Sequence, residues 1–174
     1  YGIPAGASEH RLGGLGFANW AYELAEQEKD LGVFFDTIVV CTVTGSTHAG
    51  MIAGFAALED AGGPKRRVIG IDASATLDKT RDQVSRIARH TAGLIGLGRE
   101  LREDEIVLLD GWAGDYYGIP VKSTIYAIRL TAELEGLEVA HWTRPAGGYF
   151  ESLDVVGACA ARAVAAAKED GIAL

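Results

Sequence analysis

Hydrophobic positions recur every three or four residues early in the chain, and this spacing indicates an amphipathic helix. The stripe consists of Leu15, Phe17, Trp20, Leu24 and Leu31. Gly32 follows directly. Glycine often ends a helix because it adopts the left-handed conformation without steric cost. The pattern therefore predicts a helix that ends at Gly32.

Two short runs of apolar and β-branched residues predict buried strands. The first is "FFDTIVVC" at 34–41, and the second is "RVIGIDAS" at 67–74. Continuous apolar runs of this length, bounded by turn residues, are typical of strands in a parallel sheet. Residues 47–59 carry a helical stripe between the two runs, and residues 76–98 have the pattern of a long amphipathic helix.

Strand, helix, strand, helix is the order of a parallel α/β sheet with flanking helices and right-handed crossovers. A further helix is expected from Ser123 to Gly136, and Thr76 is one of two candidate caps for the helix before it, with Asp78 the other. The character of the chain changes after Gly136. We expect an α/β domain over 1–137 and a divergent tail over 138–174 that contains an alanine-rich helix.

Composition narrows the function classes. The chain has 174 residues, 48% of them hydrophobic, which suits one globular domain. Its net charge of -8 argues against binding to a nucleic-acid backbone. No apolar run approaches the roughly 20 residues of a membrane helix, and the first residues lack signal-peptide features, so the cytoplasm is the expected location. The two cysteines and four histidines form no metal-ligand pattern.

The segment "VTGST" at 43–47 follows the first predicted strand and begins the next helix. Ligands of parallel sheets bind beyond the carboxyl ends of strands, where helix N-termini present free N–H groups. Thr44, Ser46 and Thr47 add hydroxyl donors, and Gly45 allows close approach of the backbone. There is no P-loop lysine and no three-glycine fingerprint. The loop therefore favours a single phosphate without an obligatory metal, and an ordinary N-terminal cap is the alternative.

Two further stretches are candidates for a site. The glycine-rich segment 4–17 is either a loop that allows close helix packing or part of a binding site. Tyr116 and Tyr117 lie in "GDYYGIP", a turn-rich loop. A tyrosine in such a loop is usually a packing anchor, but in a pocket its hydroxyl can exchange a proton with an amine substrate.

Several of these stretches together resemble one known family. "YGIPAGASEHRLGGLGF", "FDTIVVCTVTGSTHAGMIAGFA", "RVIGIDASA" and "YYGIPVKSTIYAIRLTAELEG" are similar, in this order, to 1-aminocyclopropane-1-carboxylate (ACC) deaminases. These are pyridoxal 5'-phosphate (PLP) enzymes of the tryptophan-synthase-β-like group (type II PLP fold). The resemblance covers residues 1 to about 137. It implies an incomplete form of that fold and a hydrolase that opens the ring of ACC to give 2-oxobutanoate and ammonia.

The resemblance also implies roles for single residues. Val43, Thr44, Gly45, Ser46 and Thr47 match the family's loop around the cofactor phosphate. Tyr117 resembles a catalytic tyrosine close to the substrate. No metal ion is implied. The family is typically oligomeric, so a homo-oligomer is a further expectation, with ACC as the small-molecule substrate.

The sequence departs from the family in three places, the smallest of which is Glu9, where an aspartate is usual. The motif of the Schiff-base lysine matches none of Lys29, Lys65, Lys79, Lys122 and Lys168. After Leu137 an Asp-Pro-Val-Tyr-Glu-Gly motif is replaced by "EVAHWTRPAGG". We therefore expect the chain by itself to be inactive as a deaminase. A D-cysteine desulfhydrase-type PLP lyase and a non-catalytic module that binds a phosphate-bearing metabolite are the alternatives.

Overall fold

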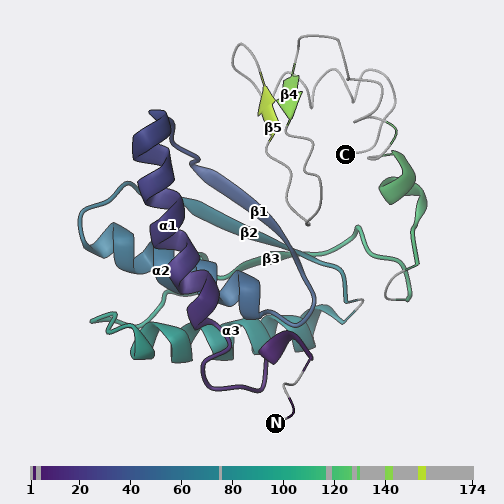
Figure 1. The fold of residues 1–174 in the computed structure, drawn as a ribbon. Helices are drawn as coiled ribbons and strands as arrows, with labels where there is room; N and C mark the ends of the chain where they lie inside the picture. The colour runs from purple at the N-terminus through teal and green to yellow at the C-terminus, as the bar shows by residue number, and fades with distance from the viewer. Residues whose placement is uncertain are drawn as a thin grey trace. The chain divides into compact units, whose positions relative to one another are not determined.

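The computed structural model describes residues 2, 5–74, 76–116, 119–126, 129, 140–142 and 153–155. The chain divides into two compact units, 1–121 and 122–174, each of which is treated by itself below. The first unit contains a three-stranded parallel sheet in the order β1-β2-β3, with helices packed on it (Figure 1). The predicted α/β class with a parallel sheet and flanking helices is confirmed.

The three strands lie side by side in the same order as in the sequence. β1 (Thr37–Thr42) pairs with β2 (Arg67–Asp72), and β2 pairs with β3 (Val107–Leu109). α2 (Ser46–Asp60) connects the first pair of strands, and α3 (Leu77–Leu94) connects the second. Because both crossovers run the same way and such crossovers are right-handed, α2 and α3 must cover the same face of the sheet.

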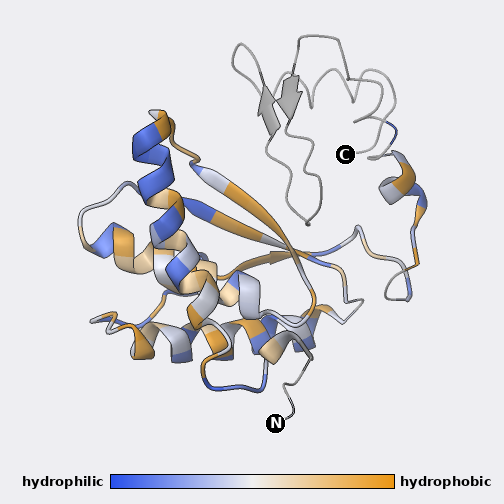
Figure 2. Ribbon diagram, viewed as in Figure 1, coloured by the Kyte–Doolittle hydropathy of each residue, from blue (hydrophilic) through white to orange (hydrophobic). Residues whose placement is uncertain are grey.

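The core lies between this face and the helices. On β1, Val40 and Thr42 are buried, whereas Val39, which points to the opposite face, is 62% exposed. α2 is the central helix, and all its residues from 48 to 56 are buried. Figure 2 shows α2 mostly in pale and hydrophobic colours, while the C-terminal half of α1 (Leu15–Leu31) is mainly hydrophilic.

α1 approaches α2 closely because glycines line the contact. A Cβ on Gly50 would lie 2.3 Å from the carbonyl oxygen of Gly14, and a Cβ on Gly54 would lie 2.6 Å from that of Ala18. α1 ends as predicted at Gly32, which has the left-handed φ of 67° and donates its N–H to carbonyls of the last turn. These contacts fix α2 against α1, and α2 carries the candidate loop at its N-terminus.

A buried ion pair holds the amino-terminal edge of the sheet. The guanidinium of Arg66 contacts both carboxylate oxygens of Glu28 at 2.7 Å and also donates to the carbonyl oxygen of Phe35 at 2.6 Å. The rings of Phe34 and Phe55 lie 4.6 Å and 4.4 Å from the same guanidinium. Glu28 in turn accepts the N–H of Phe35 at 2.8 Å. Both backbone groups of Phe35 are therefore bonded to side chains, so β1 starts at Thr37 and not at 34 as predicted.

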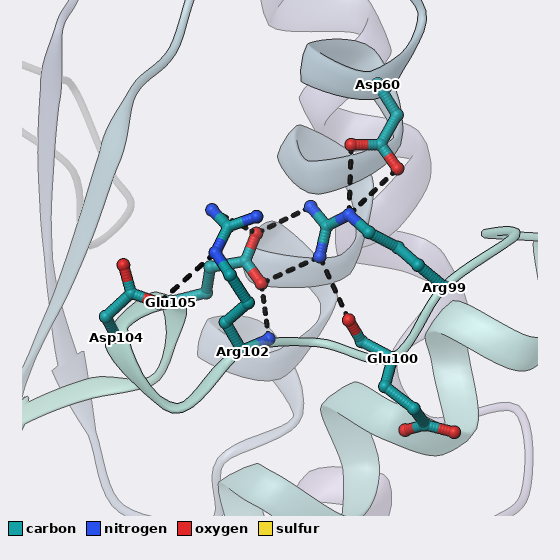
Figure 3. A network of polar contacts seen from close by, with 6 residues as sticks. All are labelled: Asp60, Arg99, Glu100, Arg102, Asp104 and Glu105. Atoms are coloured by element: carbon teal, nitrogen blue, oxygen red, sulfur yellow. Dashed lines mark hydrogen bonds and ion pairs between the residues drawn. The ribbon is translucent and has the colours of Figure 1, made fainter.

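A second polar network joins the end of α2 to the segment before β3 (Figure 3). Arg99 donates to Asp60 at 3.0 Å and to both carboxylate oxygens of Glu105 at 2.7 and 2.9 Å. The N–H of Arg102 also donates to Glu105, at 2.6 Å. Burial raises the pKa of Glu105, but the bonds from Arg99 and Arg102 outweigh it, and the net pKa lies below the ordinary value. This carboxylate therefore anchors the turn that leads into β3.

The end of α3 and the elements that follow it differ in part from the expectations. α3 stops at Leu94, before the predicted end at 98, because Gly96 takes a φ of 78°. The acidic stretch 102–110, for which no strand was predicted, contains the short 3₁₀ helix η2 (Glu103–Glu105) and β3. No described helix is long and apolar enough to span a membrane.

In the second unit, residues 122–126 are helical, which agrees with the start of the helix predicted from Ser123. β4 (Ala140–Trp142) and β5 (Leu153–Val155) form an antiparallel pair. The predicted alanine-rich helix lies outside the described residues. The boundary expected at 137 stays a prediction.

Candidate phosphate-binding site

The β1–α2 loop lies at the carboxyl edge of the sheet. β1 ends at Thr42 and α2 begins at Ser46, so only residues 43–45 connect them. Gly45 has φ 84° and ψ -14°, a left-handed conformation that side chains disfavour. A Cβ at this position would also lie 2.9 Å from Cγ2 of Val84 on α3. Both the turn and the packing of α3 therefore require glycine here.

Among the described residues, the backbone N–H groups around Gly45 have no acceptor. In the part of the chain that the structure describes, no hydrogen bond starts from the N–H of Thr44, Gly45, Ser46 or Thr47, and the first one in this region runs from Ala49 N–H to Gly45 O at 2.8 Å. α2 has no side-chain cap, and its N-cap residue is Gly45. The alternative interpretation, in which a Thr or Ser side chain caps the helix, is therefore not what the structure has.

The side chain of Ser46 is the second sign of a missing partner. Ser46 is buried, and among the described atoms its Oγ has no hydrogen-bond partner. A buried polar group is normally bonded, so an orphan beside free N–H groups calls for an explanation. Free N–H groups at a helix N-terminus carry partial positive charge, and α2 has no acidic residue in its first turn. The chemistry of the loop suits an anion with several acceptor oxygens, such as a phosphate.

Two neighbouring segments fix the loop from outside. The 3₁₀ turn η1 (Ala5–Ala7) lies against it, since a Cβ on Gly6 would come within 2.1 Å of Thr44 Oγ1. From α3, the side-chain amide of Gln83 donates to the carbonyl oxygen of Thr44 at 3.0 Å. Gly6, in the glycine-rich segment, thus contributes to the surroundings of the loop, in addition to the packing expected of that segment.

A buried histidine lies behind the loop. His48 is fully buried in the first turn of α2, and its Nδ1 lies 3.3 Å from Oγ1 of Thr42. Burial lowers the pKa of His48 to about 4, against a smaller opposing effect of the Val68 backbone. His48 is therefore neutral at neutral pH and adds no positive charge to the loop.

A cluster of hydroxyl groups follows the neighbouring strand. Ser74 Oγ donates to Asp72 Oδ1 at 2.7 Å and lies 2.7 Å from Thr80 Oγ1 on α3. Thr76, the N-cap residue of α3, has its hydroxyl 3.0 Å from Ser74 and makes no cap to the helix. Asp72 and Thr80 are buried. The cluster connects the end of β2 to the first turn of α3, the helix that contacts the phosphate loop.

The sequence-predicted site residues have different outcomes. Residues 43–47 lie together at the carboxyl edge of the sheet, where the prediction put them, and their binding role stays a prediction. Tyr117 lies outside the described residues, whereas its neighbour Tyr116 is 75% exposed. The described lysines are all exposed, so none of them is enclosed in a site: Lys29, Lys65, Lys79 and Lys122.

Two cavities of the described region lie away from this loop. One, of about 350 Å³, lies between the end of α3 and residues 97–101. The other, of about 290 Å³, lies between residues 8–11 and the middle of α3. The loop at 43–47 lines neither of them. It is a set of donors at the carboxyl edge of the sheet.

Sequence reasoning did not find Gln83, His48 or Ser74 as parts of this region. Gln83 is 39 positions from Thr44, and a glutamine on an amphipathic helix gives no sign of its partner. His48 is one of four histidines that form no ligand pattern in the sequence. "RVIGIDASA" includes Asp72 and Ser74, but nothing in the pattern indicates that they bond to α3.

The comparisons with known proteins give two family matches. The model of the family described as pyridoxal-phosphate dependent enzyme matches residues 2–146. A second model, described as aspartate amino-transferase, matches residues 119–174, which include the tail set apart in the sequence analysis. The second match covers the smaller part of the chain and shows a similarity only.

Curated relatives match most of the chain. The chain is 59% identical over 137 residues to a 1-aminocyclopropane-1-carboxylate deaminase of Methylobacterium nodulans, which is 79% of this chain and 40% of that protein. Deaminases of the same name from Mesorhizobium japonicum and Burkholderia vietnamiensis are 60% and 58% identical over the same length, with 40% and 39% of those proteins covered. The chain thus spans about two fifths of the length of the curated relatives it matches.

Proposed function

Because the chain belongs to the family of pyridoxal-phosphate dependent enzymes, we propose that its β1–α2 loop holds the phosphate of PLP. The proposal rests mainly on one observation. Four consecutive N–H groups, from Thr44 to Thr47, lack protein acceptors in the described structure, and the orphaned Oγ of Ser46 lies beside them. A phosphate has enough oxygens to accept from all these donors. Thr44, Gly45, Ser46 and Thr47 would bind it through their N–H groups, and Val43 leads into the loop.

We also propose that a complete protein with this segment is an ACC deaminase. The relatives carry this name at 58–60% identity. When bound, PLP supplies an electron sink for breaking bonds at the carbon that bears the amino group. Opening the ring of ACC and adding one water gives 2-oxobutanoate and ammonia. The residues of this chain would bind and orient the cofactor through its phosphate, which fixes the position of the ring relative to the sheet edge.

The phosphate part of the proposal is tested on the full chain. We expect 15N–1H correlation spectra to show shifts of the amides of Gly45, Ser46 and Thr47 on titration with PLP or inorganic phosphate, but not with chloride at matched ionic strength. The variant Gly45→Ala should lose these shifts because a Cβ enforces strain and contacts Val84. Shifts spread over unrelated surface residues, with none at the loop, would refute the cradle.

The substrate part needs a complete enzyme. In the deaminase of Methylobacterium nodulans, the matched residues are replaced by those of this chain, and release of 2-oxobutanoate from ACC is measured. We expect turnover of ACC and little of D-cysteine. Preference for D-cysteine would favour the desulfhydrase alternative, and a folded, PLP-loaded chimera with neither activity would contradict the proposal.

The remaining expectations from the resemblance stay with this proposal. They are a cytoplasmic location, assembly as a homo-oligomer, and a catalytic role for Tyr117. The proposed division at 137 belongs here as well; the first family match runs on to residue 146 and the second begins at residue 119, so neither has a boundary at 137.

A further inference from the structure

We propose that Gln83 is a positioning residue that aims the N–H of Gly45 at the bound anion. The inference rests on the proposed phosphate cradle and concerns a residue outside it. Gln83 lies on α3, half-buried, and donates its side-chain amide to the carbonyl oxygen of Thr44 at 3.0 Å. It is 39 positions away from Thr44 in sequence.

The argument follows from the planarity of the peptide bond. In a trans peptide, the C=O of one residue and the N–H of the next point in opposite directions. A bond from Gln83 that holds the Thr44 carbonyl toward α3 therefore turns the Gly45 N–H away from α3. The N–H groups of Ser46 and Thr47 follow at the start of α2, also without an acceptor among the described residues. One hydrogen bond from α3 thus orients a donor of the cradle.

The orientation of the Thr44–Gly45 peptide needs to be fixed because glycine also allows the opposite one. Gly45 has a φ of 84°, and rotation of the Thr44–Gly45 peptide by half a turn would bring φ to a negative value that glycine also accepts. The rotated peptide would present the Thr44 carbonyl oxygen to the anion in place of an N–H. An oxygen facing a phosphate oxygen is repelled. Gln83 opposes this rotation because it would lose its acceptor.

Two contacts, one with the loop and one with the segment after β2, hold α3 next to Gly45. Val84 is fully buried and packs on Gly45, with its Cγ2 2.9 Å from where a Cβ would be. One turn earlier, Thr80 is buried with its Oγ1 2.7 Å from Ser74 Oγ, at the end of β2. Thr80, Gln83 and Val84 therefore share one side of the helix. The sheet edge places this side against the loop.

The test uses the full chain and inorganic phosphate as probe. Gln83→Met keeps the length of the side chain and removes the donor, and Gln83→Glu keeps its polarity but cannot donate. We expect the dissociation constant for phosphate, followed at the amides of Gly45 and Ser46, to rise about fivefold in Gln83→Met, as for the loss of one hydrogen bond. The Gly45 amide resonance should also move in the free variant, since its peptide is no longer fixed.

The control is Gln27→Met on α1, where the glutamine side chain is exposed and donates to Glu23. It should bind phosphate like the parent chain. Binding by the parent with unchanged affinity in Gln83→Met would overturn the positioning role and leave the cradle intact. If the parent chain does not bind phosphate, both the cradle and the positioning role of Gln83 are wrong. If both Gln83 variants lose stability by several degrees while Gln27→Met does not, Gln83 supports the fold, and the positioning role is wrong.

Discussion

The imidazole of His48 lies directly over Gly70, so close that a Cβ on Gly70 would come within 2.3 Å of His48 Cε1. His48 belongs to the first turn of α2 and Gly70 to the middle of β2. The absence of a side chain on the strand makes the space that the imidazole fills. Through this contact, and the one with Thr42, the start of α2 is fixed on both β1 and β2.

The first prediction concerns this contact. Gly70→Ala should lower the free energy of unfolding by about 2–3 kcal/mol, since neither the buried His48 ring nor the Thr42 hydroxyl, 2.8 Å from the added atom, has room to yield. Urea denaturation followed by circular dichroism measures this. Gly93→Ala is the matched control. Gly93 lies inside α3 with nothing within 4 Å of a Cβ, and its replacement should leave stability unchanged or raise it. Equal effects of the two substitutions would contradict the close packing.

A second prediction concerns the pH dependence of stability. The pKa of His48 is lowered by burial from 6.5 to about 4. Between these values the unfolded chain binds a proton at this residue and the folded chain does not, so stability falls as the pH falls through this window. The total loss amounts to about 3 kcal/mol.

His48→Gln should remove this part of the dependence. We expect the slope of unfolding free energy against pH, measured between pH 5 and 7, to be smaller in His48→Gln than in the parent chain. His90→Gln, at an exposed position on α3, serves as control and should keep the parent slope. A His48→Gln chain with the full slope would show that other groups cause it.

The third prediction concerns the ion pair of Arg66 and Glu28, whose side chains are 4% and 6% exposed. Burial raises the pKa of Glu28, but the bonds from Arg66 and the Phe35 N–H lower it by more. The net pKa lies below the ordinary value, so the carboxylate stays ionised. Glu28→Gln leaves the Arg66 charge without its partner and should cost about 3 kcal/mol of stability. Glu26→Gln, which breaks an exposed pair with Lys29, should cost less than about 0.5 kcal/mol. Thermal unfolding compares the two, and similar losses would show that burial of the pair is unimportant.

Much of the fold could be predicted from sequence because its signals are local. The stripe from Leu15 to Leu31 and the left-handed Gly32 define α1 within a few residues. The apolar runs define β1 and β2, and their alternation with helices indicates the parallel order. β3 was missed because only Val107–Leu109 form it, and three residues after an acidic stretch carry too little pattern.

The features that the sequence did not predict depend on contacts between residues that are far apart in the chain. The beginning of β1 moved to Thr37 because Glu28 and Arg66, from other elements, bond to the backbone of Phe35. In the same way, the place of the loop at 43–47 was predictable, but its fixation by Gln83 was not, since no local rule connects α3 with this turn. Sequence locates the donors of the candidate site, and only the tertiary structure shows what orients them.

The last prediction concerns the activity of the chain by itself. Incubated with PLP and ACC, the 174-residue chain should release no 2-oxobutanoate above the background of free PLP. PLP enzymes of this kind hold the cofactor through a lysine amine as well as its phosphate. Yet the four described lysines are exposed, and Lys29 already pairs with Glu26 at 2.6 Å.

The experiment compares the chain with the deaminase of Methylobacterium nodulans under the same conditions, with 2-oxobutanoate measured after derivatisation. Reduction with borohydride adds a second readout, since it would link PLP to any lysine that had reacted with it. We expect weak labelling spread over several lysines of the chain and one strongly labelled site in the deaminase. Turnover of ACC at a rate near that of the deaminase, with labelling at one lysine, would show that this chain provides a complete site. Phosphate binding without either result would mean that the loop works as an anion cradle independently of catalysis.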